Sequence, residues 1–444
     1  MMIYYIKILR LHNCSSHSFW AYLDENSTSI QFQQENKFPL EKFLRKHSDD
    51  VIVSFDGEYL FGRYSQCINA ETFLGLDILY YLIKMQKFSI GNFLYTFRGM
   101  NASEEPFLDH RTVAPQDMTG DSPSKNYLQQ YCRLTKSFMC GEEGSQFVSE
   151  FGSDMKVQSF YQDVQPKICE NVFSFNTTPL TFDMSSKSIK KLIKSYEEYI
   201  TKIRRHGSRI YPNYYALSVV TGRLGFFEEF NPMVLPKEIR ALIVPSNDLI
   251  LSLDAKSAEP HMVFELSDTE LEHDDIYEGI METMGEESMD RDRAKSLWFN
   301  FVYGNGSVKQ STDMKRMDRS FPEISSFIRK LVMRSKKEML MYSYFGRRLP
   351  KVEGNDYKIV NYYIQSTFSD FFQLIVNRIS KELEKQSLKS KVLCTIHDEF
   401  MLDVKEKELD VIIDVVQSSI VDECERSGFD KDVIQFDASI LGVA

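Results

Sequence analysis

The stretch LILSLDAKSAEPHMVFEL, residues 249–266, changes from a strand pattern to a helix pattern within a few residues and thereby indicates a mixed α/β fold. Its apolar run, 249–253, ends at Asp254, and a helix is expected to begin near Glu259. A carboxylate at the carboxyl end of a strand, where the chain turns into a helix, is a common position for a metal ligand. Taken alone, Asp254 is explained more simply as a helix cap.

A second stretch, KVLCTIHDEFMLDV at 391–404, reads as two strands joined by a tight turn. The apolar runs 392–396 and 400–404 flank His397, Asp398 and Glu399, and in isolation these three simply make a turn. Together with Asp254, however, Asp398 supplies the second carboxylate that two Mg²⁺ ions need to clamp the oxygens of a phosphoryl group. The two aspartates therefore make one hypothesis, a two-metal site.

A third stretch, RDRAKSLWFNFVYGNG at 291–306, carries a cationic or aromatic residue at every fourth position. Arg291, Lys295, Phe299 and Tyr303 are predicted to share one helix face. The cations can hold a triphosphate, and the aromatic rings offer planes for a base or a wall for a sugar. A surface helix with a half-buried aromatic stripe would explain the rings but not the cations beside them.

The segment IVNYYIQSTFSDFFQLIV, 359–376, predicts a helix with Asn361 and Gln365 on one stripe. Amides at this spacing can reach the acceptors of a nucleic-acid minor groove without demanding one base sequence. Ordinary helix polarity is an equally good explanation.

Residues 187–209 carry eight basic side chains against Glu197 and Glu198 only. One interpretation is a helix along a phosphate backbone, with Lys190, Lys191 and Lys194 as contacts. A solvated helix face is the simpler one, and the segment's charge alone favours it. Between about 100 and 180 the periodicity fades, and we expect loops or a linker.

Composition limits the class of protein more than its function. The 444 residues suggest about three domains or subdomains. With 53 Lys and Arg against 64 Asp and Glu, the net charge of −11 excludes a nucleic-acid binder that works by bulk positive charge. The seven cysteines form no CxxC pair, and no apolar run approaches the ~18 residues of a membrane span. We expect a soluble, intracellular, cytoplasmic protein without a membrane partner.

In this order, these segments resemble the polymerase region of the DNA polymerase I family, the A family of DNA polymerases, from about 187 to 444. Asp254 with Glu259 is similar to motif A, the R-x3-K-x3-F-x3-Y-G pattern from Arg291 to motif B, and 397–399 to motif C. Other matching stretches are TGRL at 221–224, EIRALIVP at 238–245, SFPEI at 320–324, FGRRLP at 345–350, and Asn361, Gln365, Thr367 and Asp370 in N-x3-Q-x-T-x2-D.

The resemblance implies a right-hand polymerase fold with palm, fingers and thumb, preceded by a small exonuclease-like α/β domain. The implied boundaries are 1–105 for that domain, 106–205 for linker and thumb, 206–270 and 345–444 for the palm, and 271–344 for the fingers. The implied activity is template-directed addition of deoxynucleotides to a primer, with release of pyrophosphate. Implied partners are primer-template DNA and dNTPs, with a replication helicase, primase or processivity factor as further candidates.

The resemblance also assigns roles residue by residue. Asp254, Asp398 and the carbonyl of Ala255 would bind two Mg²⁺, or Mn²⁺ in their place. Arg291 and Lys295 would hold the triphosphate, and Lys295 would also oppose charge on the leaving pyrophosphate. The remaining roles are a wall over the nascent pair from Phe299 and Tyr303, exclusion of a 2′-OH by Glu259, a place near the primer end for Glu399, and primer or minor-groove contacts from Arg223, Asn361, Gln365 and His397.

This chain departs from the family pattern at several positions. Ala255 stands in place of a tyrosine, Pro260 and His261 replace an arginine, and Trp298 and Asn300 replace a small polar residue and a glycine. None of these changes removes a metal ligand. They bear on sugar discrimination and fidelity more than on the chemistry.

The amino-terminal 105 residues are faintly similar to a 3′–5′ exonuclease domain. The first strand of such a domain should carry an Asp-x-Glu pair, and IKILRLHN at 6–13 has none. Asp56 and Asp77 are the remaining candidate acids, and turn or cap positions explain both. We therefore predict a truncated, inactive exonuclease-like domain and a compact, phage-like polymerase.

Two alternative functions remain open. A single-subunit RNA polymerase of the phage type shares the palm motifs, although Glu259 and the His-Asp-Glu form of motif C argue against it. A catalytically silent DNA-binding subunit is the other, although retention of both aspartates, Arg291 and Lys295 argues against it.

Overall fold

The computed structural model describes residues 2–10, 17–86, 93, 123–185, 189–190, 192, 194–205, 207–212, 214–226, 231, 234–270, 275–285, 289–304 and 311–443. The chain forms two compact units, the first made of Met1–Val219 with Leu224–Val244, the second of Val220–Arg223 with Pro245–Ala444. Within the described ranges, no helix is both long enough and apolar enough to span a bilayer.

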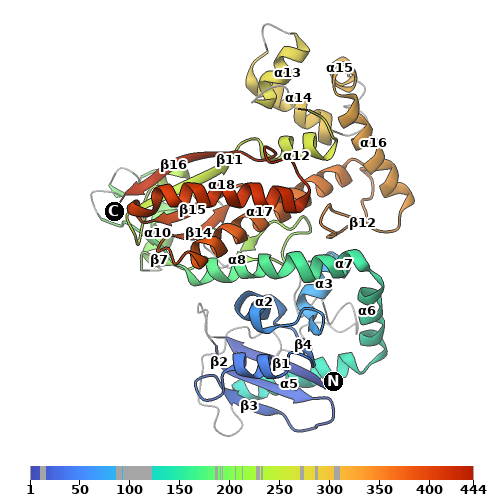
Figure 1. The fold of residues 1–444 in the computed structure, drawn as a ribbon, viewed down its shortest axis with the longest axis vertical. Coiled ribbons are helices and arrows are strands. Elements are labelled where there is room, and N and C mark those ends of the chain that lie inside the picture. The colour runs from blue at the N-terminus through green and yellow to red at the C-terminus, as the bar shows by residue number, and fades with distance from the viewer. Residues whose placement is uncertain are drawn as a thin grey trace. The chain divides into compact units, whose positions relative to one another are not determined.

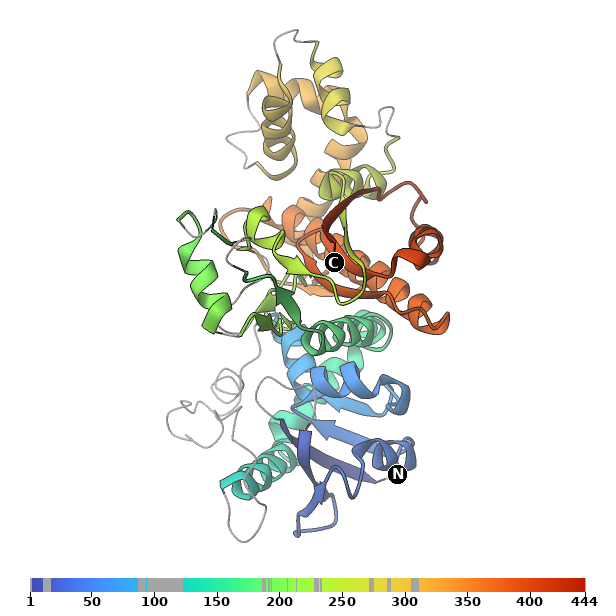
Figure 2. The same cartoon turned by 90° about the vertical axis from the view of Figure 1, so that its left-hand side faces the viewer.

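The first unit contains a five-stranded mixed sheet with the order β3-β2-β1-β4-β5 (Figures 1 and 2). Its strands are β1 (Ile3–Arg10), β2 (His17–Asp24), β3 (Gln31–Gln34), β4 (Val51–Ser54) and β5 (Phe73–Gly75). β1 pairs antiparallel with β2 and parallel with β4, so a hairpin is followed by a crossover through α1 (Leu40–Lys46). Helix α2 (Gly57–Tyr64) follows β4, and helix α3 (Leu76–Lys84) follows β5.

The region expected to be a loop or linker is largely helical, which corrects the prediction for 123–177. The helices are α5 (Pro123–Met139), α6 (Glu142–Ser153), α7 (Met155–Ser159) and α8 (Gln165–Thr177), with a π-helical turn at Phe160–Val164. α5 packs on β1 and β2 and buries Leu128, Tyr131 and Cys132 there. Its apolar stripe is interrupted by polar residues, which hid the helical period in the sequence.

The rest of the first unit consists of short elements. They are β6 (Leu180–Phe182), α10 (Glu197–Arg205), β7 (Arg209–Ile210), β8 (Tyr214–Tyr215), β9 (Gly225–Phe226), α11 (Lys237–Arg240) and β10 (Ile243–Val244). The strands pair as a β10-β6-β7 sheet and a β8-β9 hairpin. In the basic segment 187–209, helix α10 begins at Glu197, and Lys187 and Lys191 lie outside the described residues.

A buried ion pair lies in the first unit beside β1. Lys7 Nζ is 2.7 Å from Asp56 Oδ1, with side-chain exposures of 8% and 3%. Asp56 Oδ2 also accepts the backbone N–H of Ile8 at 3.0 Å, and Lys7 lies over the ring of Tyr131. Asp56 thus neutralises a buried cation and caps a strand N–H.

Asp77, 4% exposed, accepts the backbone N–H groups of Gly57 and Glu58 at 2.8 and 3.1 Å. Burial, with the charge of Asp56 adding to it, raises the pKa of Asp77 to about 7 against these hydrogen bonds. The stabilisation from protonated Asp77 is fully present below the ordinary pKa of 3.8 and is lost as the pH rises through about 7.

We expect the advantage in unfolding free energy of the wild type over Asp77→Asn to be larger at about pH 5 than at about pH 8, because only the wild type loses this proton. Urea unfolding at both pH values measures it. A difference between the two proteins that stays constant across this range would contradict the assignment.

The second unit is built around a four-stranded antiparallel sheet with the order β14-β15-β11-β16. Its strands are β11 (Leu249–Ala255), β14 (Lys391–Ile396), β15 (Glu399–Val404) and β16 (Phe436–Val443). The strand predicted at 249–253 and the hairpin at 391–404 are therefore confirmed. A short hairpin joins β12 (Met341–Tyr342) to β13 (Arg348–Leu349).

The helices of the second unit include each one predicted from the motifs. They are α12 (Ala258–Leu266), α13 (Ile276–Met284), α14 (Arg291–Tyr303), α15 (Thr312–Ser320), α16 (Pro322–Lys337), α17 (Lys358–Lys385) and α18 (Leu409–Ser427). Helix α17 packs on the sheet (Figure 1). The ring of Phe372 on α17 contacts Phe400 of β15 and Phe436 of β16.

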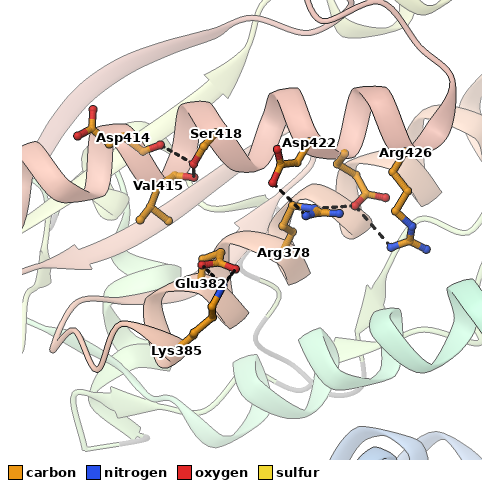
Figure 3. A network of polar contacts seen from close by, with 9 residues as sticks. Arg378, Glu382, Lys385, Asp414, Val415, Ser418, Asp422 and Arg426 are labelled. Atoms are coloured by element: carbon orange, nitrogen blue, oxygen red, sulfur yellow. Dashed lines mark hydrogen bonds and ion pairs between the residues drawn. The ribbon is translucent and has the colours of Figure 1, made fainter.

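Polar contacts join α17 to α18 (Figure 3). Arg378 on α17 donates to Glu423 at 2.9 Å and to Asp422 at 3.3 Å, and the Glu423 side chain is only 2% exposed. These contacts and the apolar face of α17 hold the two helices against the sheet that carries Asp254.

Candidate active site

A polar cleft of about 980 Å³ in the second unit collects most of the predicted site residues. Its lining comes from the loop at Arg223, from strands β11 and β16, from helices α12, α13, α14 and α17, and from the β14–β15 turn. The predicted residues that line it are Arg223, Asp254, Ala255, Glu259, Arg291, Lys295, Phe299, Tyr303, Asn361, Gln365 and Asp398. Segments more than 170 residues apart in the sequence, from Arg223 to Asp398, thus meet in one cavity.

The cleft does not collect every predicted residue. Glu399 and His397 are not among its lining residues. Lys190 and Lys194 are exposed and belong to the first unit, and Lys191 lies outside the described residues.

Strand register brings the two aspartates to the same place. Asp254, the penultimate residue of β11, pairs across the sheet with Glu399, the first residue of β15. Asp398 precedes Glu399 in the hairpin turn, and its carbonyl accepts the Ala255 N–H at 3.0 Å. The carboxyl end of β11 and the hairpin tip are therefore joined directly by backbone.

Both turns at this edge use the left-handed region of the backbone. His397 has φ +58° in the hairpin turn, and Ser257 has φ +43° between β11 and α12. Non-glycine residues rarely adopt such angles, and they concentrate where the surrounding structure enforces a functional geometry. The turn at Ser257 leads directly into the first residues of α12, Ala258 and Glu259.

The donor atoms at this edge suit a hard divalent cation. Carboxylate and carbonyl oxygens are what Mg²⁺ prefers, and it is commonly held by one or two carboxylates with waters and phosphates. Asp254 and Asp398 supply two carboxylates, and Ala255 is the backbone carbonyl candidate. Among the described residues, no group of three His, Cys, Asp or Glu side chains is arranged to hold a metal by itself. Mg²⁺ bound here would thus complete its shell from waters and substrate.

Glu399 is held within the sheet beside Asp254. Its carboxylate is hydrogen-bonded to Ser252 on β11, and the residue is 8% exposed. The position fixes the start of β15 against β11, next to the Asp254 pairing.

Helix α14 presents its cations to the cleft because its opposite face is packed. Asp290 caps the helix by accepting the Arg293 N–H at 2.8 Å. Trp298, buried to 1% exposure, stacks on Phe264 of α12 at 5.4 Å. The bulky residue that departs from the family pattern at 298 is therefore part of the contact between α12 and α14.

Arg291 is already engaged within the cleft. Its guanidinium bonds Asp275 Oδ2 through Nε at 3.2 Å and Nη2 at 3.1 Å and lies 4.8 Å from the ring of Tyr277. Partial burial would raise the pKa of Asp275, but hydrogen bonds from the Tyr277 N–H and Arg291 outweigh it and lower that pKa. Asp275 is thus an anion held beside a predicted triphosphate ligand.

Glu259 is held at both carboxylate oxygens. Oε1 forms an ion pair with Arg223, and Oε2 accepts the Tyr303 hydroxyl at 2.9 Å. Burial, with the nearby charge of Glu259 adding to it, raises the pKa of Tyr303, so its phenol stays protonated and donates. Three predicted residues from three separate segments therefore form one hydrogen-bonded group.

Several lining residues were missed from the sequence. They are Lys256, Ser257, Ala258, Pro260, His261, Asp275, Tyr277, Glu278 and Asp437. Asp437 on β16 pairs in register with Asp254 on β11 and forms an ion pair with Lys256 at 2.9 Å. No sequence motif predicts this placement. Asp275 caps α13 by accepting the Tyr277 N–H, and Tyr277 lies in the first turn of that helix. Burial lowers the pKa of His261 and so favours its neutral form.

Comparison with known proteins gives a family match to more than half of the chain. The model described as DNA polymerase family A matches residues 179–429. This range includes the whole lining of the cleft except Asp437.

The chain is also similar to individual proteins. DNA polymerase I of Lactococcus lactis subsp. lactis (strain IL1403) is 25% identical over 280 residues, 54% of this chain and 32% of the relative. DNA polymerase I of Aquifex aeolicus (strain VF5) is 21% identical over 301 residues, 60% of this chain and 49% of the relative. The chain thus spans about a third to a half of the length of these relatives.

The fold resembles that of the POL domain of Pol1 from M. smegmatis, solved in complex with a DNA primer-template and dNTP. The TM-score is 0.69 at 12% sequence identity, over 99% of this chain and 94% of that chain. The predicted right-hand fold of mixed helices and strands is confirmed by this likeness.

Proposed function

Because this chain belongs to DNA polymerase family A, we propose that it is a template-directed DNA polymerase that extends a primer 3′-OH with deoxynucleotides and releases pyrophosphate, in replication or repair. One observation carries the proposal. A single cleft brings together Asp254 near the end of β11, Asp398 in the adjoining β14–β15 turn, and the cations and aromatic rings of α14.

Asp254, Asp398 and the Ala255 carbonyl are the residues we propose to hold two Mg²⁺ ions, with Mn²⁺ as an alternative. When bound, these ions would lower the pKa of the attacking hydroxyl and stabilise charge on the transferring phosphoryl group. The chain's part is to hold both carboxylates at one sheet edge through the Ala255 N–H bond to Asp398.

Arg291 and Lys295 lie one turn apart on α14 and are proposed to bind the triphosphate. Lys295 would oppose negative charge on the departing pyrophosphate, where a fixed cation stabilises the transition state. Phe299 and Tyr303 follow on the same face, with ring centroids 5.9 Å apart, and would form the wall beside the nascent base pair.

Glu259 is proposed to exclude ribonucleotides. Since Arg223 and Tyr303 fix both its oxygens, the carboxylate cannot swing away from a 2′-OH without losing a bond. We expect Glu259→Ala to reduce the preference for dNTP over rNTP by roughly 100-fold. A fixed side chain that rejects the 2′-OH contributes several kcal/mol to the discrimination between the two sugars. Single-nucleotide kcat/KM for the two sugars measures it, and an unchanged ratio would contradict the role.

Primer and template contacts are proposed for Arg223, Asn361, Gln365 and His397, with Glu399 near the primer end. Lys190, Lys191 and Lys194 are proposed to bind duplex phosphates in the thumb. Thumb, palm and fingers at 106–205, 206–270 with 345–444, and 271–344 remain proposals, since compactness divides the chain only into two units.

The amino-terminal domain is proposed to be an inactive exonuclease relative. Support comes from Asp56, which is already bonded to Lys7 and the Ile8 N–H, and from Asp77, which holds two backbone N–H groups. Metal-dependent degradation of single-stranded DNA that survives Asp398→Ala but is lost in Asp56→Ala would overturn this.

Location and partners complete the proposal. A cytoplasmic location fits the cysteines, since none of the six in the described residues forms a disulfide. The proposed partners are primer-template DNA and dNTPs, and a replication helicase, primase or processivity factor would assist a phage-like enzyme of this size.

Primer extension on a DNA template with Mg²⁺ tests the function, with four dNTPs in one reaction and four rNTPs in another. We expect extension with dNTPs alone. Equal use of both sugars would favour the phage-type RNA polymerase, and intact duplex binding without any extension would favour a silent DNA-binding subunit.

A further inference from the structure

The second unit also holds a buried pair of charges that the proposed chemistry does not use. Arg347, in the turn between β12 and β13, bonds Asp370 of α17 through Nε at 3.2 and 3.0 Å and through Nη2 at 2.6 Å. The two side chains are 2% and 0% exposed. The Arg347 N–H also donates to Ser343 Oγ at 3.2 Å, and the Ser343 N–H donates to the Arg347 carbonyl at 2.7 Å. The guanidinium therefore has a fixed position and orientation.

Gly222 lies against the face of this guanidinium. A Cβ on Gly222 would lie 2.8 Å from Cζ and Nη2 of Arg347 and 2.9 Å from Nε. Nearly equal distances to three atoms of a planar group place that Cβ over its face. Gly222 also has φ +77°, a left-handed backbone that glycine adopts without cost. Only glycine satisfies both conditions here.

The next residue after Gly222 is the partner of the proposed sugar gate. Arg223 forms the ion pair with Glu259 Oε1, while Tyr303 holds Oε2. Thr221 on the other side of Gly222 is 3% exposed, so the loop is anchored on both sides. A shift of Gly222 would move Arg223 and leave Glu259 with one fixed oxygen.

We propose that Arg347, held by Asp370, is a positioning residue for sugar discrimination, which sets the 221–223 loop through close contact with Gly222 and so aims Arg223 at Glu259. The inference rests on the proposed function. Asp370 lies on α17, the helix that also carries Asn361 and Gln365, so one helix supports both the cleft wall and this loop.

Gly222→Ala tests the contact, and Gly354→Ala is its matched control. Gly354 has φ +79° and nothing within 4 Å of an added Cβ, so both variants carry the same backbone strain while only the first meets Arg347. We expect Gly222→Ala to lower the dNTP-to-rNTP ratio of kcat/KM about 10- to 100-fold, the range of one lost charged hydrogen bond. Gly354→Ala should keep the wild-type ratio, and thermal melting checks that both variants fold.

Two further variants separate positioning from general disruption. Arg347→Lys keeps a cation for Asp370 but lacks the planar guanidinium, and we expect it also to lose sugar preference. In an Arg223→Met background, Gly222→Ala should have no additional effect on the ratio, because the two changes act through one contact.

The outcomes distinguish this inference from the proposed function. Wild type that prefers dNTPs, with Gly222→Ala folded and equally selective, overturns the inference and leaves the function standing. A similar loss in Gly354→Ala also overturns it, because strain alone would then explain the effect. Wild type that does not extend primers, or that uses both sugars equally, overturns the function or the gate role of Glu259 and the inference with it.

Discussion

Asp254→Asn and Asp398→Asn each lower the rate of primer extension by roughly a thousandfold or more, because each removes a charged metal ligand worth several kcal/mol of transition-state stabilisation. Asparagine keeps the size of the side chain, so the Ala255 N–H bond to the Asp398 backbone is retained. Single-turnover extension measures the rate, and fluorescence anisotropy of labelled duplex should show unchanged DNA binding.

Asp437→Asn is the matched control for these variants. Asp437 lines the same cleft and is the other cross-strand neighbour of Asp254, but it forms an exposed ion pair with Lys256. We expect its loss to change the rate little, since an exposed pair contributes little. An Asp398→Asn protein that still extends primers, or an equal loss in Asp437→Asn, would contradict the assignment.

Lys7→Met lowers the unfolding free energy of the first unit by about 3–5 kcal/mol, because it leaves the Asp56 carboxylate buried without its cation. The double variant Lys7→Met/Asp56→Asn should recover much of this loss, since asparagine can still accept the Ile8 N–H without a charge. Urea unfolding followed by Trp20 fluorescence in a Trp298→Phe background reports on this unit alone, because the chain has two tryptophans.

Lys84→Met provides the comparison for a partly exposed pair in the same unit. Lys84 lies 3.1 Å from Glu150, with side-chain exposures of 29% and 35%. We expect a cost below about 1 kcal/mol, in keeping with solvent-screened pairs. If Lys7→Met is no more destabilising than Lys84→Met, the buried pair does not stabilise the unit as described.

The elements that carry the site could be predicted from the sequence because their patterns are local. The strand before Asp254, the hairpin around Asp398 and the helix from Arg291 follow from apolar runs and fourfold spacing, and all three are observed. Their meeting in one cleft depends on the β14-β15-β11-β16 order, which only tertiary packing decides.

The interactions that could not be predicted join residues that are far apart in the chain. The Arg223–Glu259 pair joins residues 36 positions apart, and Arg291 takes its carboxylate from Asp275 at the start of another helix. Lys7 looks like a polar interruption of an apolar strand, and its partner Asp56 comes 49 residues later. The helices of 123–177 were missed because their buried stripe mixes aromatic, sulfur and polar residues, as at Tyr131, Cys132 and Thr135.

The most direct test of the central proposal is templated selection of the incoming nucleotide. Four primer-templates that differ only in the first template base are each offered each of the four dNTPs with Mg²⁺, and the rate of single-nucleotide addition is measured. We expect fast addition only for the Watson–Crick partner of each template base, with no addition in Asp254→Asn. Addition at equal rates whatever the template base, or undiminished addition in Asp254→Asn, would contradict a template-directed polymerase acting through this cleft.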